Sequence, residues 1–178
     1  MLNLLEPGGL GLAIIPINCV CSLMDKEIEK REKILEKHTL LGVMSMPTTL
    51  FYPVGTVTAI VIFEAHRPHD SKIKSWFGYC RDDGFIVSRN SGRIDRNKKW
   101  EEKKSLWVNS FRNRETIKDF SILRAVTAKD EWCAEAYLQP DYSQISEQKF
   151  QRAVEEYFVY KALYTSRFEE IGEENAEA

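Results

Sequence analysis

The sequence has few of the residues that build metal sites or disulfide frameworks. Four cysteines and three histidines occur among its 178 residues. No two cysteines have the two-residue gap of a zinc knuckle, and His66 and His69 lack a cysteine or second histidine pair nearby. We therefore expect no metal site and predict buried, reduced thiols, as in a cytoplasmic protein.

Long hydrophobic runs are also missing. The first twenty residues are largely apolar, but Glu6, Pro7 and two glycines interrupt them, and no basic segment precedes them as in a signal peptide. No stretch reaches the roughly 20 apolar residues that cross a bilayer. We predict a cytoplasmic protein without a membrane segment.

Charge is plentiful but unevenly distributed. With 43% hydrophobic and 29% charged residues, the composition predicts a globular chain of one domain, or one domain with an appendage. The net charge of −2 argues against a simple nucleic-acid binder. Residues 81–118, however, carry eleven basic and six acidic side chains, whereas residues 119–178 carry six basic and thirteen acidic ones. The basic middle predicts either a surface for a polyanion or a solvated loop before an acidic tail.

The beginning of the chain predicts a helix end followed at once by a strand. Residues 2–5 resemble the last turn of a helix, which Pro7, Gly8 and Gly9 would end. The apolar run 10–17 is nearly unbroken, as in strands that are buried on both faces of a sheet. Such a start is typical of a sheet that continues into segments outside this sequence.

An amphipathic helix and two further strands follow. The spacing of apolar residues predicts a helix over 23–37, for which Ser22 is a suitable N-cap. Residues 40–46 and 56–65 have the apolar and β-branched composition of strands. The link between these strands is too short for a helical crossover, so they should pair antiparallel.

The pattern changes after Pro68. Residues 72–80 and 85–87 predict two strands joined by a turn, and therefore a second hairpin. A helix should begin near Trp100, and a last one after Ser146, which would cap it.

Three segments together resemble the catalytic domain of N6-adenine DNA methyltransferases, above all the modification subunits of type I restriction systems. They are LLEPGGLGLAIIP (Leu4–Pro16), the helix that contains Arg31, and LLGVMSMPTTLFYPVGTVTAIVIFEAHRP (Leu40–Pro68). In that family a helix ends in a Gly-Gly pair before such a strand, and a helix and an antiparallel hairpin follow. Phe77–Asp95 and Asp130–Tyr142 also resemble the family, so the resemblance spans nearly the whole chain.

The resemblance implies an α/β fold in two parts. Residues 1–70 would be the C-terminal half of a class I (Rossmann-like) methyltransferase sheet. Residues 71–178 would be a hairpin and a mostly helical extension, with the basic stretch 81–118 and an acidic tail. S-adenosylmethionine would be the methyl donor of the complete enzyme, and a flipped adenine its target.

The two motifs that carry out this reaction in the family are absent from the sequence. These are a glycine-rich loop after the first strand and an Asn/Asp-Pro-Pro-Tyr/Phe motif after the fourth. Gly8–Gly11 precedes a predicted strand instead of following one, so the helix N-terminus that would receive an anion is missing. We therefore expect this chain alone to contain no catalytic or cofactor-binding residue and to be inactive.

Two groups of residues are candidates for contact with DNA. In the family an aromatic residue near the start of the hairpin helps to hold the flipped base, and Phe51, with Tyr52 beside it, matches that position. The alternative is that both pack at the sheet edge. The second group is basic and suits phosphate or subunit contacts, although Glu101 and Glu102 interrupt it and favour a solvated surface. It comprises Arg89, Arg93, Arg96, Lys98, Lys99, Lys103 and Lys104.

The sequence favours the C-terminal portion of a site-specific N6-adenine DNA methyltransferase of a restriction-modification system. Its predicted partners are DNA and either an N-terminal methyltransferase half or a specificity subunit. The open sheet edge also predicts a homodimer. The alternative is a non-catalytic module that binds DNA or a subunit of the restriction-modification complex. A hydrolase is disfavoured because no nucleophile elbow occurs and Asp82-Asp83 fits a turn.

Overall fold

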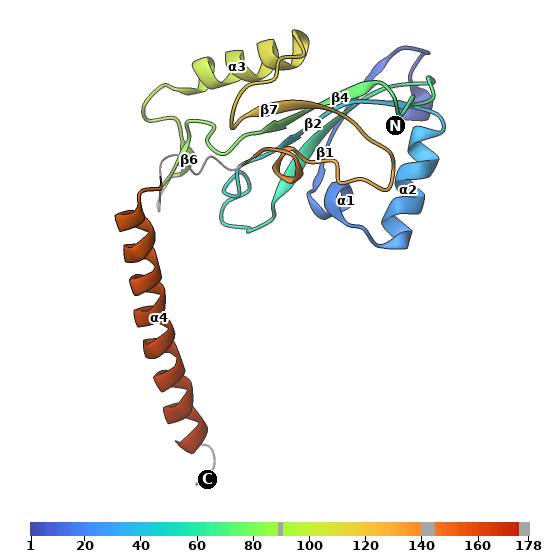
Figure 1. Ribbon diagram of the computed structural model, residues 1–178. Coiled ribbons are helices and arrows are strands. Elements are labelled where there is room, and N and C mark those ends of the chain that lie inside the picture. The colour runs from blue at the N-terminus through green and yellow to red at the C-terminus, as the bar shows by residue number, and fades with distance from the viewer. Residues whose placement is uncertain (89–90, 140–144, 175–178) are drawn as a thin grey trace. The chain divides into compact units, whose positions relative to one another are not determined.

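The computed structural model describes residues 1–88, 91–139 and 145–174, with side chains as far as Ala162 in the last segment (Figure 1). The chain separates into two compact units, Met1–Gln139 and Pro140–Ala178. All of the predicted site residues fall within the range of the first unit.

A five-stranded mixed sheet forms the centre of the first unit, with the order β1-β3-β2-β4-β7 among the described residues. Both β1 and β2 pair antiparallel with β3, β2 pairs parallel with β4, and β4 pairs antiparallel with β7. The β5 and β6 strands form a separate ribbon. The strands are β1 (Leu10–Pro16), β2 (Thr39–Ser45), β3 (Thr58–Glu64), β4 (Lys74–Tyr79), β5 (Ile86–Ser88), β6 (Gly92–Ile94) and β7 (Ser121–Ala125).

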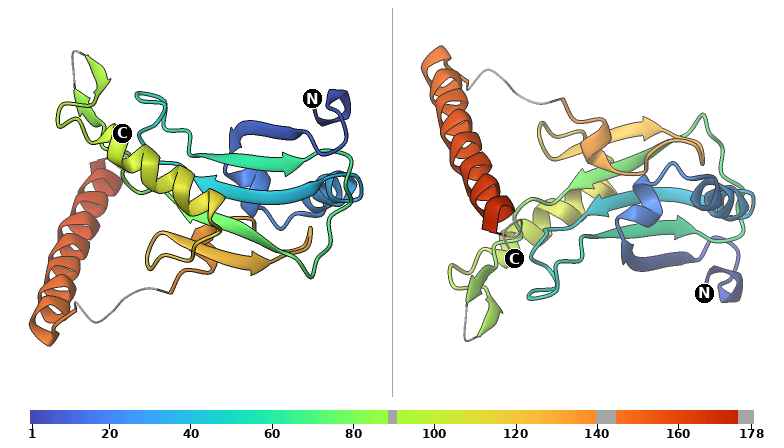
Figure 2. Two further views of the ribbon diagram at one scale, coloured as in Figure 1. Left: turned by 90° about the horizontal axis from the view of Figure 1, so that it is seen from above. Right: turned by 90° about the horizontal axis from the view of Figure 1, so that it is seen from below.

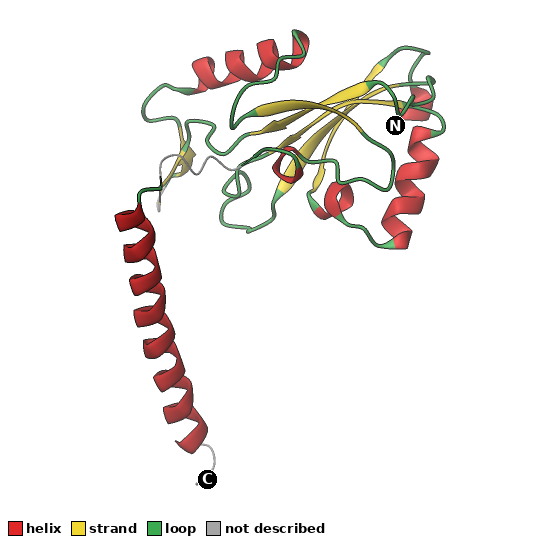
Figure 3. Cartoon of the chain, viewed as in Figure 1, coloured by secondary structure: helices red, strands yellow, loops and turns green. Residues whose placement is uncertain are grey.

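Helices cover the two faces of the sheet to different extents (Figures 2 and 3). On one face, α1, α2 and η2 enclose a core that includes Val43, Phe77 and Trp132. On the other face, α3 packs Trp107 against Trp76 and Met44. The helical elements of this unit are η1 (Leu2–Leu4), α1 (Asn18–Cys21), α2 (Asp25–Leu35), α3 (Trp100–Arg112) and η2 (Ala134–Ala136).

The expectation that residues 10–17 are buried on both faces is wrong. The β1 strand lies at the end of the described sheet, and its exposure alternates. Leu10, Leu12 and Ile14 are 60%, 56% and 56% exposed. The composition of this segment would suit a strand that is covered on both faces. On this face, however, α3 lies over β2 and β4, and no other described helix or strand packs on these three side chains.

The predicted hairpin of residues 72–80 and 85–87 is also wrong. The β4 strand lies inside the sheet between β2 and β7, while β5 pairs with β6. Because the side chains from Ser75 to Gly78 are buried, β4 is a central strand that needs a hydrogen-bonding neighbour on each side. These neighbours are β2 and β7, and the sequence pattern revealed neither pairing.

The expected mostly helical extension needs the same correction. Residues 71–139 contribute four strands, two of which enlarge the main sheet, as well as α3 and η2. Strand β4 joins the main sheet because it pairs with β2. Tertiary contacts therefore decide that this part of the chain contains strands as well as helices. The division into parts 1–70 and 71–178 stays a prediction about which residues belong to the methyltransferase half.

Other expectations agree with the structure. The second and third strands pair antiparallel, and α2 and α3 lie where the apolar spacing indicates. The hydroxyl of Ser146 accepts the amide of Lys149 at 3.3 Å. Ser22 does not cap α2, whose N-cap is Met24; its hydroxyl accepts the Met24 amide at 3.3 Å instead.

The second unit contains the long helix α4 (Glu147–Glu174). Most of its described large apolar side chains are exposed, and Val154 is half-buried. The exposed ones are Phe150, Tyr157, Phe158, Val159 and Tyr160. Across the described residues, no helix is both long enough and apolar enough to cross a membrane.

Candidate functional site

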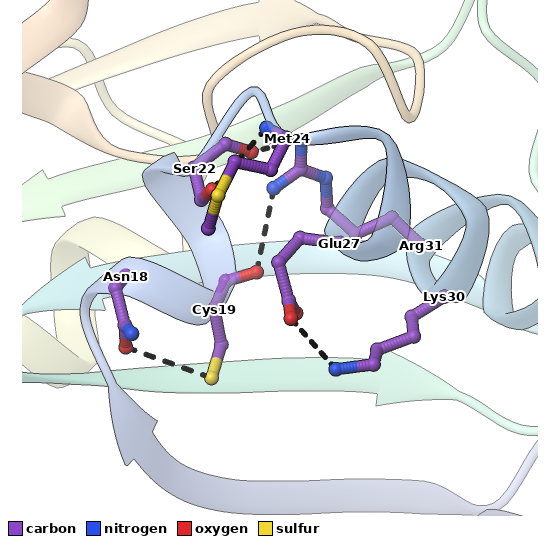
Figure 4. Close-up of polar contacts among 7 residues, drawn as sticks. All are labelled: Asn18, Cys19, Ser22, Met24, Glu27, Lys30 and Arg31. Carbon is purple, nitrogen blue, oxygen red and sulfur yellow. Dashed lines mark hydrogen bonds and ion pairs between the residues drawn. The ribbon is translucent and has the colours of Figure 1, made fainter.

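The buried guanidinium of Arg31 organises the chain after β1 (Figure 4). Arg31 is 2% exposed and donates to the backbone carbonyls of Cys19 at 3.4 Å, Val20 at 3.3 Å and Ser22 at 2.8 Å. It also donates to the carbonyl of Ala128 at 2.8 Å. Burial lowers the pKa of Arg31, yet four carbonyl acceptors stabilise the charged form. The arginine therefore joins α1, α2 and the segment after β7.

Trp132 completes this junction. Its backbone amide donates to the Val20 carbonyl at 2.9 Å, and its ring lies 5.5 Å from the Arg31 guanidinium carbon. The indole nitrogen donates to the Thr127 carbonyl at 2.9 Å. These contacts hold the chain rigidly behind the carboxyl end of β1.

An apolar groove of about 540 Å³ opens at the carboxyl end of β1. Because β1 and β2 are both antiparallel to β3, they are parallel to each other and end at the same edge of the sheet. Carboxyl ends of parallel strands are the usual ligand-binding edge of α/β sheets. The groove is lined by Ile14, Ile15, Pro16, Leu50, Phe51, Tyr52, Val54, Thr56 and Thr58.

Phe51 and Tyr52 line this groove and are 44% and 46% exposed. Consecutive tight turns present them. The Leu50 amide donates to the Pro47 carbonyl at 3.0 Å, and the Tyr52 amide donates to the Thr49 carbonyl at 3.1 Å. Both rings are thus outside the buried core and close to the sheet edge. Their role in holding a base stays a prediction.

Thr58 also lines this groove, and the sequence analysis did not single it out. The residue is 4% exposed, and its hydroxyl oxygen is buried without a hydrogen-bond partner among the described residues. A buried, unsatisfied hydroxyl costs about 1–3 kcal/mol of folding free energy. Its neighbour in the groove, Thr56, is exposed. Nothing in the sequence distinguishes these two threonines, because only the fold buries one of them.

The glycines near the N-terminus do not form a cradle for S-adenosylmethionine. The Gly8 amide donates to the Ala65 carbonyl at 2.9 Å, and the Gly9 amide donates to the Glu6 carbonyl at 2.9 Å. Gly8 has a φ of +80°, as expected of a turn residue. Both amides are therefore already paired within the chain, as in a structural turn, and this turn does not offer them to a ligand. No group of three or more candidate metal ligands occurs in the part of the chain that the structure describes.

Several of the basic candidates form ion pairs within the chain. The guanidinium of Arg93 donates to both carboxylate oxygens of Asp83 at 2.6 Å. Lys103 lies 3.2 Å from a carboxylate oxygen of Asp82, and Lys104 lies 2.6 Å from Glu101. The Gly84 amide and Lys103 lower the pKa of Asp82, which therefore stays charged. These three cations are largely neutralised locally.

The remaining described candidates are Arg96, Lys98 and Lys99. All three are exposed and form no ion pair with another described residue. They occupy the turn before α3, where the Asp95 carboxylate accepts the backbone amide of Lys99 at 2.9 Å. This turn is the strongest local concentration of free positive charge among the predicted residues. Arg89 lies outside the described residues.

The fold defines the broad class of the protein. It is similar to a solved chain from the type I R-M system, with a TM-score of 0.52 and 16% identity over 94% of this chain and 36% of that chain. It is also similar to the type I restriction-modification methyltransferase subunit of Streptococcus thermophilus, with a TM-score of 0.50 and 18% identity over 66% of this chain and 23% of that chain. The class is thus an α/β fold shared with methyltransferase subunits of restriction-modification systems.

Sequence comparison then identifies the family. The chain belongs to the N-6 DNA Methylase family, whose model matches residues 1–164. It is 26% identical over 160 residues to the type II restriction enzyme and methyltransferase RM.BcgI of Heyndrickxia coagulans. That alignment covers 90% of this chain and 25% of RM.BcgI, so the chain spans about a quarter of this relative's length. The resemblance to N6-adenine DNA methyltransferases is therefore confirmed.

Proposed function

We propose that this chain is the C-terminal portion of a site-specific N6-adenine DNA methyltransferase of a restriction-modification system. The observation that carries the proposal is the order β1-β3-β2, in which the antiparallel β3 separates two parallel strands. This order suits the last three strands of a class I methyltransferase sheet. Family membership and the sheet-edge groove support the same assignment.

The catalytic half would dock on the open side of β1. Leu10, Leu12 and Ile14 form an apolar stripe on this strand, and β1 has a hydrogen-bonding neighbour among the described strands only on its β3 side. A strand from the catalytic half would pair with β1, and a helix would cover the stripe. That half would bring S-adenosylmethionine and the catalytic motif, from the same polypeptide or a separate one.

Calorimetric titration of this chain with S-adenosylmethionine tests the proposal most directly. The amides of the N-terminal glycine turn are already paired, so we expect no heat up to millimolar donor. Clear micromolar binding would contradict the proposal, because the donor site would then lie within these residues. Adding a polypeptide with both missing motifs should restore donor binding and adenine methylation.

A matched pair of variants tests the docking surface. The double variant L10S/L12S leaves the groove residue Ile14 unchanged. It should abolish that restoration while changing the stability of the chain alone by about 0.5 kcal/mol or less per site, as for exposed positions generally. The control variant L4S changes an exposed leucine in η1, outside the stripe, and should leave restoration intact. Full restoration by the double variant would refute docking on this stripe.

DNA would contact the chain at two places in the assembled enzyme. Phe51 and Tyr52 would hold the flipped adenine by stacking, and Arg96, Lys98 and Lys99 would contact phosphates. A triple change of these cations to glutamine should weaken binding to all DNA sequences alike and flatten its salt dependence. A loss confined to one sequence would contradict phosphate contact.

The alternative is a non-catalytic module of a restriction-modification complex. The exposed aromatic side chains of α4 favour it, since a helix with Phe150, Tyr157 and Tyr160 exposed suits a partner helix such as one from a specificity subunit. Tight DNA binding by this chain alone, together with failure of any catalytic half to restore methylation, would favour the module. A homodimer through β1 is a further possibility for the isolated chain, and a compact monomer at high concentration in sedimentation would exclude it.

A further inference from the structure

The stability of the fold does not explain why position 58 holds a threonine. Its side chain is buried and its hydroxyl has no partner among the described residues. Valine has nearly the same shape and a higher preference for strands, and it would bury no polar atom. In the free chain the hydroxyl therefore only destabilises the folded state, which suggests that a ligand supplies its missing partner.

The backbone of Thr58 is fixed, so only its side chain can respond to a ligand. The residue pairs with Pro16 in the β1–β3 ladder, and its carbonyl accepts the Met46 amide at 2.9 Å. Turning χ1 from one staggered rotamer to the next exchanges the positions of hydroxyl and methyl. The hydroxyl can thus be presented to the groove without moving the strand.

The rest of the groove indicates which ligand fits. Its walls are aliphatic or aromatic at Ile14, Leu50, Phe51 and Val54, and Thr58 is its buried polar position. A flat heterocycle with apolar faces and a hydrogen-bonding edge matches this combination. A hydroxyl both donates and accepts, so it can pair with a ring nitrogen or with an amino group.

We propose that the Thr58 hydroxyl hydrogen-bonds the edge of a purine base held in this groove, and that it thereby positions the base. This inference rests on the proposed function, in which the base is the target adenine. Thr58 would be the polar contact of the groove and Phe51 its stacking surface.

The test is an NMR titration of the full chain with 9-methyladenine, comparing wild type with T58V. The nearly isosteric valine removes only the hydroxyl, so binding should weaken about 3- to 10-fold, as expected for one hydrogen bond. The same variant should melt about 2–4 °C higher, because a buried unpaired polar atom is gone. T58S restores the hydroxyl and should restore binding.

Two further variants separate this inference from the proposed function. T116V removes an exposed hydroxyl outside the groove and should bind like wild type. F51A should weaken binding, whatever the role of Thr58. If wild type binds, F51A weakens it and T58V does not, the inference on Thr58 is overturned while the base site stands. If wild type does not bind 9-methyladenine, both the base site and the inference fail.

Discussion

The interior strand β4 and the terminal strand β1 of the central sheet are covered differently on the face that α3 occupies. On β4, Trp76 is fully buried beneath α3, and its indole nitrogen donates to the Ser110 hydroxyl at 3.3 Å. On β1, Leu12 and Ile14 on the same face are each 56% exposed. The sequence of β1 is the more apolar of the two, yet β1 is the less covered strand, so the difference lies in what packs on each strand.

This comparison shows that one strand of a sheet can be fully covered while another strand of the same sheet exposes apolar side chains. Strand β4 has its covering helix and both of its neighbouring strands, β2 and β7, within the described chain. Strand β1 has a cover on its other face, where α1 and the Arg31 junction lie, but an exposed apolar stripe on this one. An apolar stripe on an edge strand is typical of an interaction surface. In the proposed assembly, the catalytic half would cover this stripe.

The largest expected effect is on the covered strand. W76A should lower the free energy of unfolding by about 3–5 kcal/mol, because it removes a fully buried indole and leaves a cavity. I14A on the less covered strand should change it by about 0.5 kcal/mol, since that side chain is mostly exposed. Urea unfolding of both variants gives the comparison. Similar losses in the two variants would mean that the two strands do not differ in solution.

An intermediate effect is expected at the junction behind β1. R31M keeps much of the side-chain volume but removes the donors to four backbone carbonyls, and should cost about 2–4 kcal/mol. R31K retains the charge but not the planar set of donors, so it should recover only part of the loss. Full recovery by lysine in urea unfolding would show that charge alone matters at this position.

The smallest expected effect is a pH dependence where the N-terminal turn is attached. The Nδ1 of His38 accepts the His66 amide at 3.1 Å, and His66 contacts the Leu5 carbonyl at 2.9 Å. Burial, followed by the nearby His66, lowers the pKa of His38, so the folded state favours the neutral ring. The neutral His38 ring therefore contributes stability above its unfolded pKa of about 6.5, and this contribution is lost as pH falls through the lower pKa of the folded state.

Urea midpoints at about pH 7.5 and 5.5 measure this dependence, the two values bracketing the unfolded pKa of histidine. H38N keeps an acceptor near the Nδ1 position and does not titrate, so its midpoint should fall less between these pH values than that of wild type. An equal fall in both proteins would assign the pH dependence to other groups.

The sequence pattern predicted the structure well where that structure depends on residues close together in the chain. The helix around Arg31 and the antiparallel return of β3 follow from apolar spacing and from a link too short to cross over. The second hairpin failed because β4 is stabilised by β2 and β7, which lie far from it in sequence. Spacing along the chain holds no information about such distant neighbours.

The candidate site was predictable to a similar extent. Phe51 and Tyr52 followed from a family resemblance, and the structure brings both to the groove. Arg93 was predicted as a DNA contact from its charge, but its position opposite Asp83 emerges only when β6 approaches the turn after β4. Thr58 could not be singled out, since burial of its hydroxyl depends on the packing around it.

The sequence by itself determined the family and the first strand-helix-strand segment, because these depend on residue types in fixed local order. Only the tertiary structure decided which apolar strand is covered, which cations are neutralised and which threonine is buried without a partner. Each of these is a relation between residues distant in the chain, and free energies of burial and pairing arise only when the fold brings such residues together.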